Sequence, residues 1–249
     1  MGIPNNLVNV LNPTIPVDHG IFEESTTQKA RLGSRLAVGD KVFRYAKLSA
    51  SANVLQGDLL CATVPIASHL SGMLTISVQT AGATFLTCSA SAGNEFRANQ
   101  YAEGYVTVAS TGLAGGGIQL RIRSHTSGAQ VAFYTYDTLP EAVAAGPGVL
   151  TPCIYNGVLQ GNSPADLPVG VAPVDVTTGN YFWLQTWGLA SIKSSTDMAH
   201  GMVLCAGVSG GFATHLVVAS LTAGGLIIGK NLGSATISQA TPVWLTISP

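Results

Sequence analysis

Charge is scarce along this chain. Lys, Arg, Asp and Glu make up 9% of its 249 residues, against roughly 25% in an ordinary soluble domain. The basic and acidic side chains nearly balance and leave a formal net charge of −1. A nucleic-acid-binding protein would carry a basic excess, which is missing here. So few charges also protect a free monomer poorly against association, so either the chain buries surface against other subunits or Ser, Thr and Gly cover its surface.

Cysteine is rare as well, and its spacing excludes the common thiol motifs. Cys61, Cys88, Cys153 and Cys205 stand far apart in apolar or small-residue surroundings, and no C-x-x-C occurs. We expect four buried free thiols in a protein made in a reducing compartment. Disulfides are the lesser alternative, and the spacing argues further against a zinc site.

Long hydrophobic runs are absent. The most apolar stretch, residues 216–228, is interrupted by Ser, Thr and Gly, and it is shorter than the ~20 residues that a membrane-spanning helix needs. Residues 1–6 have neither the basic start nor the apolar core of a secretory signal. We therefore expect no membrane association and no secretion signal.

The residue patterns of common active sites are missing too. The five histidines are His19, His69, His125, His200 and His215. None of them pairs with another His or a carboxylate at metal-ligand spacing. The Gly-rich runs at 115–117 and 209–211 lack the Lys-Ser/Thr of a phosphate loop, and no G-x-S-x-G occurs. Sparse carboxylates make a glycosidase pair hard to place, although position alone does not exclude one. We expect no enzymatic activity, no metal and no cofactor.

Strand patterns fill most of the chain. Residues 42–46, 74–79 and 118–124 alternate apolar and polar side chains, as half-buried strands do. Gly-rich turns separate such segments about every 8–12 residues, which is typical of β-sandwiches and barrels. Residues 137–145 favour a short helix or a turn. The sequence predicts an all-β fold, an antiparallel sandwich or barrel in two lobes.

Breaks in this pattern suggest four segments. Residues 1–26 hold three prolines and no sustained period, which predicts an extended N-terminal arm. Residues 27–146 would form a first β lobe and residues 174–249 a second. Between them, residues 147–173 are rich in Pro, Gly and Asn and are expected to be a loop-rich linker. In the second lobe, the apolar runs at 226–229 and 243–247 predict buried strands.

Two groups of side chains are candidates for partner contacts. Six of the eleven basic residues lie within residues 27–62. The candidates are Leu7, Val8, Val10, Leu11 and Ile15 in the arm, with Lys29, Arg31, Arg35 and Lys41 in the basic cluster. The arm could instead pack on its own domain. The basic cluster could equally be a solvated face that nearby carboxylates neutralise.

An aromatic strand offers a third candidate. Tyr181, Trp183 and Trp187 have the same parity along a strand and could share one face. Exposed, such rings could stack on sugars. The alternative is that they fill the core of a chain otherwise rich in Gly and Ala, and we favour that interpretation.

Several segments resemble a known family. The runs LGSRLAVGDKVFRYAK (32–47) and GDLLCA (57–62) stand near the start. Residues 99–106 follow an N-x-Y-x-x-G pattern, and residues 179–188 follow G-x-Y-x-W-x-Q-x-x-G. Together these segments resemble a family of tailed-bacteriophage virion proteins, the capsid decoration or head-stabilising group. The matching motifs are structural rather than chemical.

The resemblance implies a structural role. A member of this family would be a capsid decoration, or cement, protein that binds the major capsid protein on the outside of a phage head. It would be made in the host cytoplasm and would act as a homo-oligomer, a trimer at threefold positions of the shell. It would need no cofactor, nucleic acid or membrane. The alternative is a receptor- or glycan-binding β domain of a phage fibre or head fibre, which would need exposed aromatic rings around Trp183.

Overall fold

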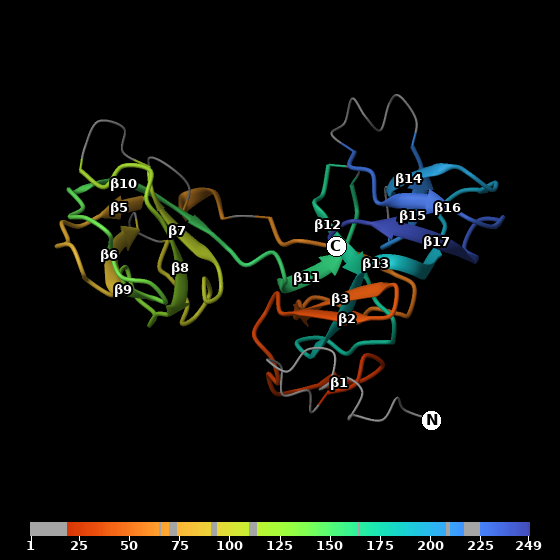
Figure 1. Ribbon diagram of the computed structural model, residues 1–249, viewed down its shortest axis with the longest axis horizontal. Coiled ribbons are helices and arrows are strands. Elements are labelled where there is room, and N and C mark those ends of the chain that lie inside the picture. The colour runs from red at the N-terminus through yellow and green to blue at the C-terminus, as the bar shows by residue number, and fades with distance from the viewer. Residues whose placement is uncertain are drawn as a thin grey trace. The chain divides into compact units, whose positions relative to one another are not determined.

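The computed structural model describes residues 19–64, 66–69, 74–90, 94–109, 114–163, 165–207, 210–216 and 225–249. Within these ranges the chain is built from β-strands, with one 3-10 turn, η1 (Ala67–His69) (Figure 1). The predicted all-β class is therefore confirmed. Residues 137–145 form bends rather than a helix, apart from a strand-like bridge at Val143.

The chain divides into two compact units. Unit 1 combines Met1–Thr63 with Ile154–Pro249, and unit 2 is Val64–Cys153. Unit 2 is thus an insertion in the sequence of unit 1, whereas the sequence pattern suggested two consecutive lobes, 27–146 and 174–249. The expected linker at 147–173 instead contains most of one strand of unit 2 and two strands of unit 1. Local patterns did not reveal this because the strands of unit 1 pair across more than a hundred residues.

A closed circuit of five strands forms one part of unit 1. The circuit runs through β3 (Lys41–Leu48), β13 (Tyr181–Lys193), β12 (Pro168–Val171), β4 (Leu59–Cys61) and β11 (Asn156–Gln160), and returns to β3. The contact between β11 and β3 is parallel and the others are antiparallel. Two further strands, β2 (Arg35–Val38) and β1 (Glu24–Ser25), pair with β3 and with the start of β13.

The second half of β13 carries the remaining strands of the same sheet. Residues 187–193 pair with β17 (Ala240–Thr246), which is followed by β16 (Gly229–Asn231), β14 (Val203–Ala206) and β15 (Ala213–His215). A core cluster that includes Ile192, Leu204, Val243 and Leu245 fills its inner side. The prediction of buried strands at 226–229 and 243–247 is wrong. Leu226 and Ile227 are exposed and precede β16, and residues alternate between core and solvent along β17.

Unit 2 is a closed antiparallel barrel. Its strands follow the order β10 (Gly146–Thr151), β5 (Leu74–Ile76), β6 (Phe85–Ala90), β9 (Gln130–Thr135), β8 (Gln119–Ser124) and β7 (Tyr105–Val108). Leu86, Ile122, Phe133 and Leu150 are among the buried side chains of its core. A Cβ at Gly148 on β10 would lie 2.6 Å from Cδ1 of Ile76, so a larger residue there would displace the Ile76 side chain.

A buried group of histidine and aromatic rings lies in unit 2. The ring of His125 lies 4.4 Å from that of Phe133, centroid to centroid. Its Nε2 accepts a hydrogen bond from the backbone N–H of Tyr101 at 3.0 Å, so its Nδ1 carries the proton and donates to the carbonyl of Thr126 at 2.8 Å. Both ring nitrogens are therefore satisfied in the neutral imidazole. Burial lowers the pKa of His125, and the hydrogen bond to Thr126 opposes this only in part.

The predicted state of the cysteines is confirmed, since all four are free and buried. Among the described residues, no helix is long and apolar enough to cross a membrane.

Candidate functional site

An exposed row that is apolar except for Lys230 crosses four adjacent strands of unit 1. Val203 on β14 lies opposite Lys230 on β16, Lys230 opposite Trp244 on β17, and Trp244 opposite Leu189 on β13. Directly opposite residues of antiparallel strands share a face of the sheet. The three apolar members are 36–40% exposed, although their strand neighbours Leu204 and Leu245 are buried. We call these four residues the outer row.

A groove adjoins the outer row at Leu189. It has a volume of about 360 Å³, and its apolar walls include Phe22, Pro173, Leu189 and Pro242. Phe22 is 61% exposed, a high value for such a large ring. Lys41 is the charged residue of the lining. The groove and the outer row therefore form one continuous surface of low charge on unit 1.

Gln185 explains why a groove exists beside β13. Strand β12 pairs with β13 at a single register, Val171 with Gln185. Past that point the Gln185 side chain, which is 5% exposed, donates from Nε2 to the carbonyls of Trp187 at 3.1 Å and Leu189 at 2.9 Å. A side-chain amide thus satisfies two carbonyls that a neighbouring strand would otherwise bind. The space beside them is left open as a groove.

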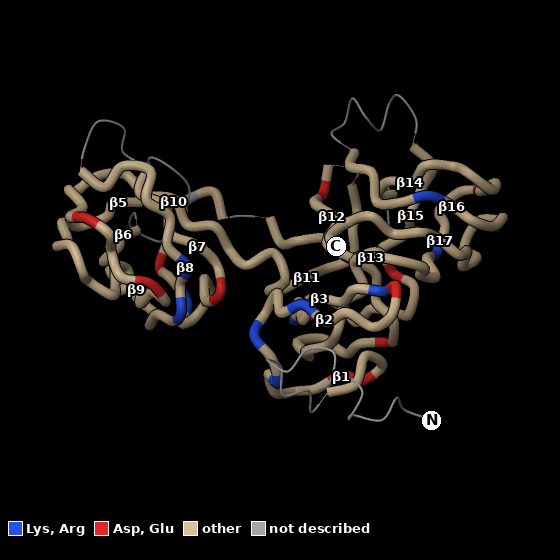
Figure 2. Tube along the Cα trace, in the orientation of Figure 1, with Lys and Arg blue, Asp and Glu red and all other residues tan. Residues whose placement is uncertain are grey.

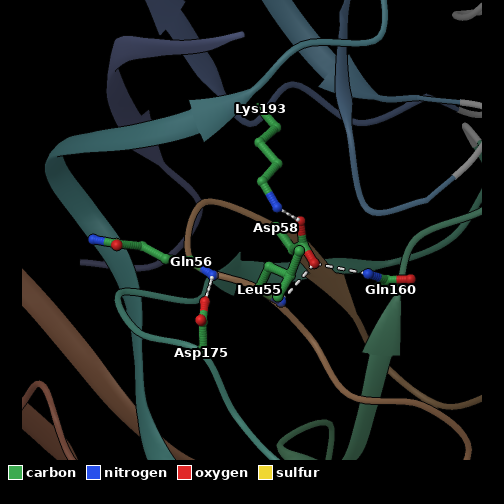
Figure 3. Close-up of polar contacts among 6 residues, drawn as sticks. All are labelled: Leu55, Gln56, Asp58, Gln160, Asp175 and Lys193. Carbon is green, nitrogen blue, oxygen red and sulfur yellow. Dashed lines mark hydrogen bonds and ion pairs between the residues drawn. The ribbon is translucent and has the colours of Figure 1, made fainter. Parts of the chain in front are cut away.

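A buried carboxylate fixes one wall of the groove. The network consists of Leu55, Gln56, Asp58, Gln160, Asp175 and Lys193 (Figure 3). Oδ2 of Asp58 accepts hydrogen bonds from the backbone N–H of Leu55 at 2.8 Å and from Nε2 of Gln160 at 2.7 Å. Its Oδ1 lies 2.7 Å from Nζ of Lys193. The N–H of Gln56 donates a further hydrogen bond to Asp175 at 2.7 Å. Together these contacts fix the turn that contains Gln56, and Gln56 lines the groove.

The structure separates the predicted basic cluster. Lys41 lies at the turn between β2 and β3, opposite Val38, and lines the groove. Arg35 lies at the other end of this hairpin, opposite Arg44. Lys29 and Arg31 are exposed in the segment before β2. Figure 2 shows the Lys and Arg positions of unit 1 on separate segments of the chain. Of the four predicted contact residues in this cluster, Lys41 alone is placed in the candidate site.

The predicted contact residues of the arm lie outside the described part of the chain. They are Leu7, Val8, Val10, Leu11 and Ile15. Of the expected arm, residues 1–26, the structure describes 19–26, where β1 pairs with the start of β13. Phe22 in this segment reaches the groove.

Trp183 belongs to the core, so an exposed sugar platform at this residue is contradicted. It is 1% exposed, its indole N–H donates to the carbonyl of His19 at 3.1 Å, and its ring meets Tyr45 edge-on at 5.0 Å. Tyr181 and Trp187 are half-buried, and Tyr181 stacks on Tyr45. The alternation of residues along the strand was compatible with Trp183 facing either solvent or the core. Its burial shows that it faces the core.

Sequence reasoning missed most of the candidate site. Within residues 240–246, strict alternation would have placed Trp244 and Pro242 on the face opposite Val243 and Leu245. That signal was present but was interpreted as a buried strand. No comparable local signal marked Gln185. Its side chain binds two backbone carbonyls of β13 beyond the point where β12 stops pairing with that strand, and local sequence does not show where this point lies.

Among the described residues, no group of three or more His, Cys, Asp or Glu side chains is placed to hold a metal ion. Comparison of the chain with protein families, with curated proteins and with solved structures finds no match. The function must therefore be argued from the surface chemistry of the two units.

Proposed function

We propose that this chain is a structural virion protein that decorates the outside of a phage head and stabilises it. The observation that carries the proposal is the apolar surface of unit 1, the outer row with its adjoining groove. A continuous exposed apolar surface on a soluble domain is typical of a protein-binding site. The segments that resemble the decoration family, and the low content of charge, support the same conclusion.

The partner in this proposal is the major capsid protein. Trp244 would be the central anchor, because Trp is enriched among residues that dominate interface energies. Leu189 and Phe22 would add apolar contact, and full burial of such a side chain contributes about 1.5–3 kcal/mol. Lys41 and Lys230 would set orientation at the rim more than affinity. Binding to the assembled shell but not to its open forms would stabilise the shell by mass action.

The arm and the remaining basic residues would add contacts within a homotrimer or to neighbouring capsid subunits. Threefold positions of a shell present three equal sites, which a trimer occupies without mismatch. This part of the proposal concerns Lys29, Arg31 and Arg35, together with the five apolar residues of the arm.

The test uses heads assembled without this protein, from the phage that encodes it. The full chain and its Leu189→Asp and Trp244→Asp variants would be incubated with these heads, and co-sedimentation would give the bound fraction. We expect each variant to bind at least tenfold more weakly, because a carboxylate would be buried without a partner. Val78→Asp is the matched control, since Val78 is a 67% exposed residue of unit 2. Equal head binding by all four proteins would refute the role of the outer row.

A further inference from the structure

Unit 2 carries a second surface, with different chemistry. Tyr105 on β7 and Tyr134 on β9 are 39% and 41% exposed on the outside of the barrel. Arg121 and Arg123 lie on β8, the strand between β7 and β9. We call these four residues the tyrosine–arginine face. Two strand spacings, about 10 Å, separate the tyrosines laterally. They are also offset along β8 by three residues, about another 10 Å, because Tyr105 lies opposite Arg121 and Tyr134 opposite Ser124.

A β-bulge displays one of the arginines. The pairing of β8 with β9 shifts between Ile122, opposite Thr135, and Ser124, opposite Tyr134. Arg123 is the extra residue, and its side chain is exposed. Bulges re-aim side chains and are common beside binding sites. Arg123 forms no ion pair with the carboxylates of the described residues.

A strained and buried residue holds the other arginine in place. Glu103 has φ of 64°, in the left-handed region that residues other than Gly usually avoid, and it is 9% exposed. Its Oε2 lies 2.8 Å from Nη2 of Arg121, and its Oε1 accepts a hydrogen bond from the hydroxyl of Tyr136 at 2.5 Å. The Arg121 guanidinium also lies 5.7 Å from the centre of the Tyr136 ring. Strain and a buried charge are often retained where they fix the geometry of a binding surface.

The rest of this surface is polar. Gln119 on β8 donates to the hydroxyl of Thr107 on β7 at 3.2 Å, and Gln130 on β9 is exposed. The Val, Leu, Ile and Phe side chains of β7, β8 and β9 are buried in the barrel. A protein interface would be expected to centre on an apolar core. On the outer face of these three strands the one aliphatic side chain is the small Ala132. Rings with amides, hydroxyls and guanidinium groups suit the mixed faces of a sugar better.

We propose that the tyrosine–arginine face binds an oligosaccharide that carries a carboxylate. Tyr105 and Tyr134 stack on the C–H faces of two sugar residues. Arg123 binds the carboxylate through paired N–H donors, a geometry that guanidinium favours. Glu103 is a positioning residue that holds Arg121 and Tyr136 beside the sugar. This site is independent of the apolar surface of unit 1, and either could be refuted without the other.

The test is a calorimetric or NMR titration of the full chain with two matched probe pairs. Sialyllactose is compared with lactose, and trigalacturonic acid with maltotriose, so that each acidic probe has a neutral counterpart. We expect at least one acidic probe to bind tenfold or more tightly than its counterpart. Arg123→Gln should abolish that preference, and Tyr105→Ala and Tyr134→Ala should each weaken binding about tenfold.

The controls use residues of the same barrel. Thr75→Ala changes an exposed residue of β5, which stands three strands from β8 around the closed barrel, and it should leave affinity unchanged. Arg97→Gln removes an exposed positive charge elsewhere in unit 2. If Arg97→Gln weakens binding as much as Arg123→Gln does, the attraction is a general effect of charge and the proposal fails. It also fails if no acidic probe binds, or if binding survives both tyrosine variants.

Glu103→Gln tests the positioning role. It should reduce the preference for the acidic probe while leaving the far-ultraviolet circular dichroism of the protein unchanged. A purely structural role for Glu103 would instead weaken acidic and neutral probes equally, which would overturn this assignment.

Discussion

The ammonium group of Lys193 lies 2.7 Å from the buried carboxylate of Asp58, although the two residues are 135 positions apart in the sequence. Asp58 is 1% exposed, so its charge has little contact with water. The pair joins the turn before β4 to the end of β13, and these are the segments that border the groove.

Removal of this cation should destabilise unit 1. In Lys193→Met, the Asp58 carboxylate keeps two N–H donors but loses its counter-ion, which typically costs about 3–5 kcal/mol for a buried pair. Because Lys193 is 21% exposed, we expect the lower end of that range. Urea unfolding followed by Trp fluorescence gives the change, since Trp183, Trp187 and Trp244 all lie in unit 1.

Two comparisons control this measurement. Lys230→Met removes an exposed ammonium group of the same unit and should change stability by about 0.5 kcal/mol or less. The double variant Asp58→Asn with Lys193→Met should recover part of the loss, because no unpaired charge is left. If Lys193→Met were no more harmful than Lys230→Met, the ion pair would not hold the groove wall.

The buried imidazole of His125 should make the stability of unit 2 depend on pH. Burial lowers its pKa below the ordinary value of 6.5. The folded chain has the lowered pKa and the unfolded chain has the ordinary one. Between these two values the unfolded chain binds the proton and the folded chain does not, so stability rises with pH there. Stability should be fully present above about pH 6.5, decrease as the pH falls, and level off below the folded pKa.

Hydrogen exchange of the amides in β8 and β9 is the suitable measurement, because unit 2 contains no Trp. His125→Gln can still accept from the Tyr101 N–H but cannot take up a proton near neutral pH, so its protection should vary less between pH 7.5 and 5.5. The interpretation would be wrong if the variant kept the full pH dependence of the parent protein.

The four thiols should be unreactive until the protein unfolds. Burial raises the pKa of Cys61 and of Cys88 to about 12, and the thiolate is the reactive form. At pH 8 we expect negligible reaction with a disulfide reagent in the native protein, and four equivalents in denaturant. Rapid modification of even one thiol in native protein would contradict this placement.

The insertion of unit 2 can be tested by excision. Thr63 hydrogen-bonds to the carbonyl of Gly157, and Cys61 pairs with Leu159, so the chain leaves and re-enters unit 1 at adjacent positions. Residues 64–153 should therefore be replaceable by a short Asn-Gly turn. The remaining chain should keep the Trp emission and cooperative unfolding of unit 1. If the remaining chain were unfolded, unit 1 would depend on unit 2 for its folding, whatever the behaviour of residues 64–153 alone.

Much of the local structure could be predicted from the sequence. Alternation at 42–46, 74–79 and 118–124 located β3, β5 and β8, because strand side chains point to opposite faces in turn. The apolar surroundings of the cysteines indicated their burial. Lys41 was identified as a candidate contact residue from charge alone. It lines the groove, and its contact with a partner stays a prediction.

The candidate site itself could not be predicted in the same way. Phe22, Gln185, Leu189 and Pro242 come from distant segments. They meet because β13 pairs first with β3 and then with β17, a change of partner that local sequence does not encode.

By itself the sequence determined that the chain would form strands, carry little charge and bury its thiols, since these follow from side-chain chemistry and the two-residue period of a strand. Only the tertiary structure decided that residues 64–153 form an inserted barrel, that Trp183 faces the core, and that Trp244 faces solvent. The physical reason is that alternation separates two faces without saying which one is covered. Long-range strand pairing, through register and neighbouring strands, makes that choice.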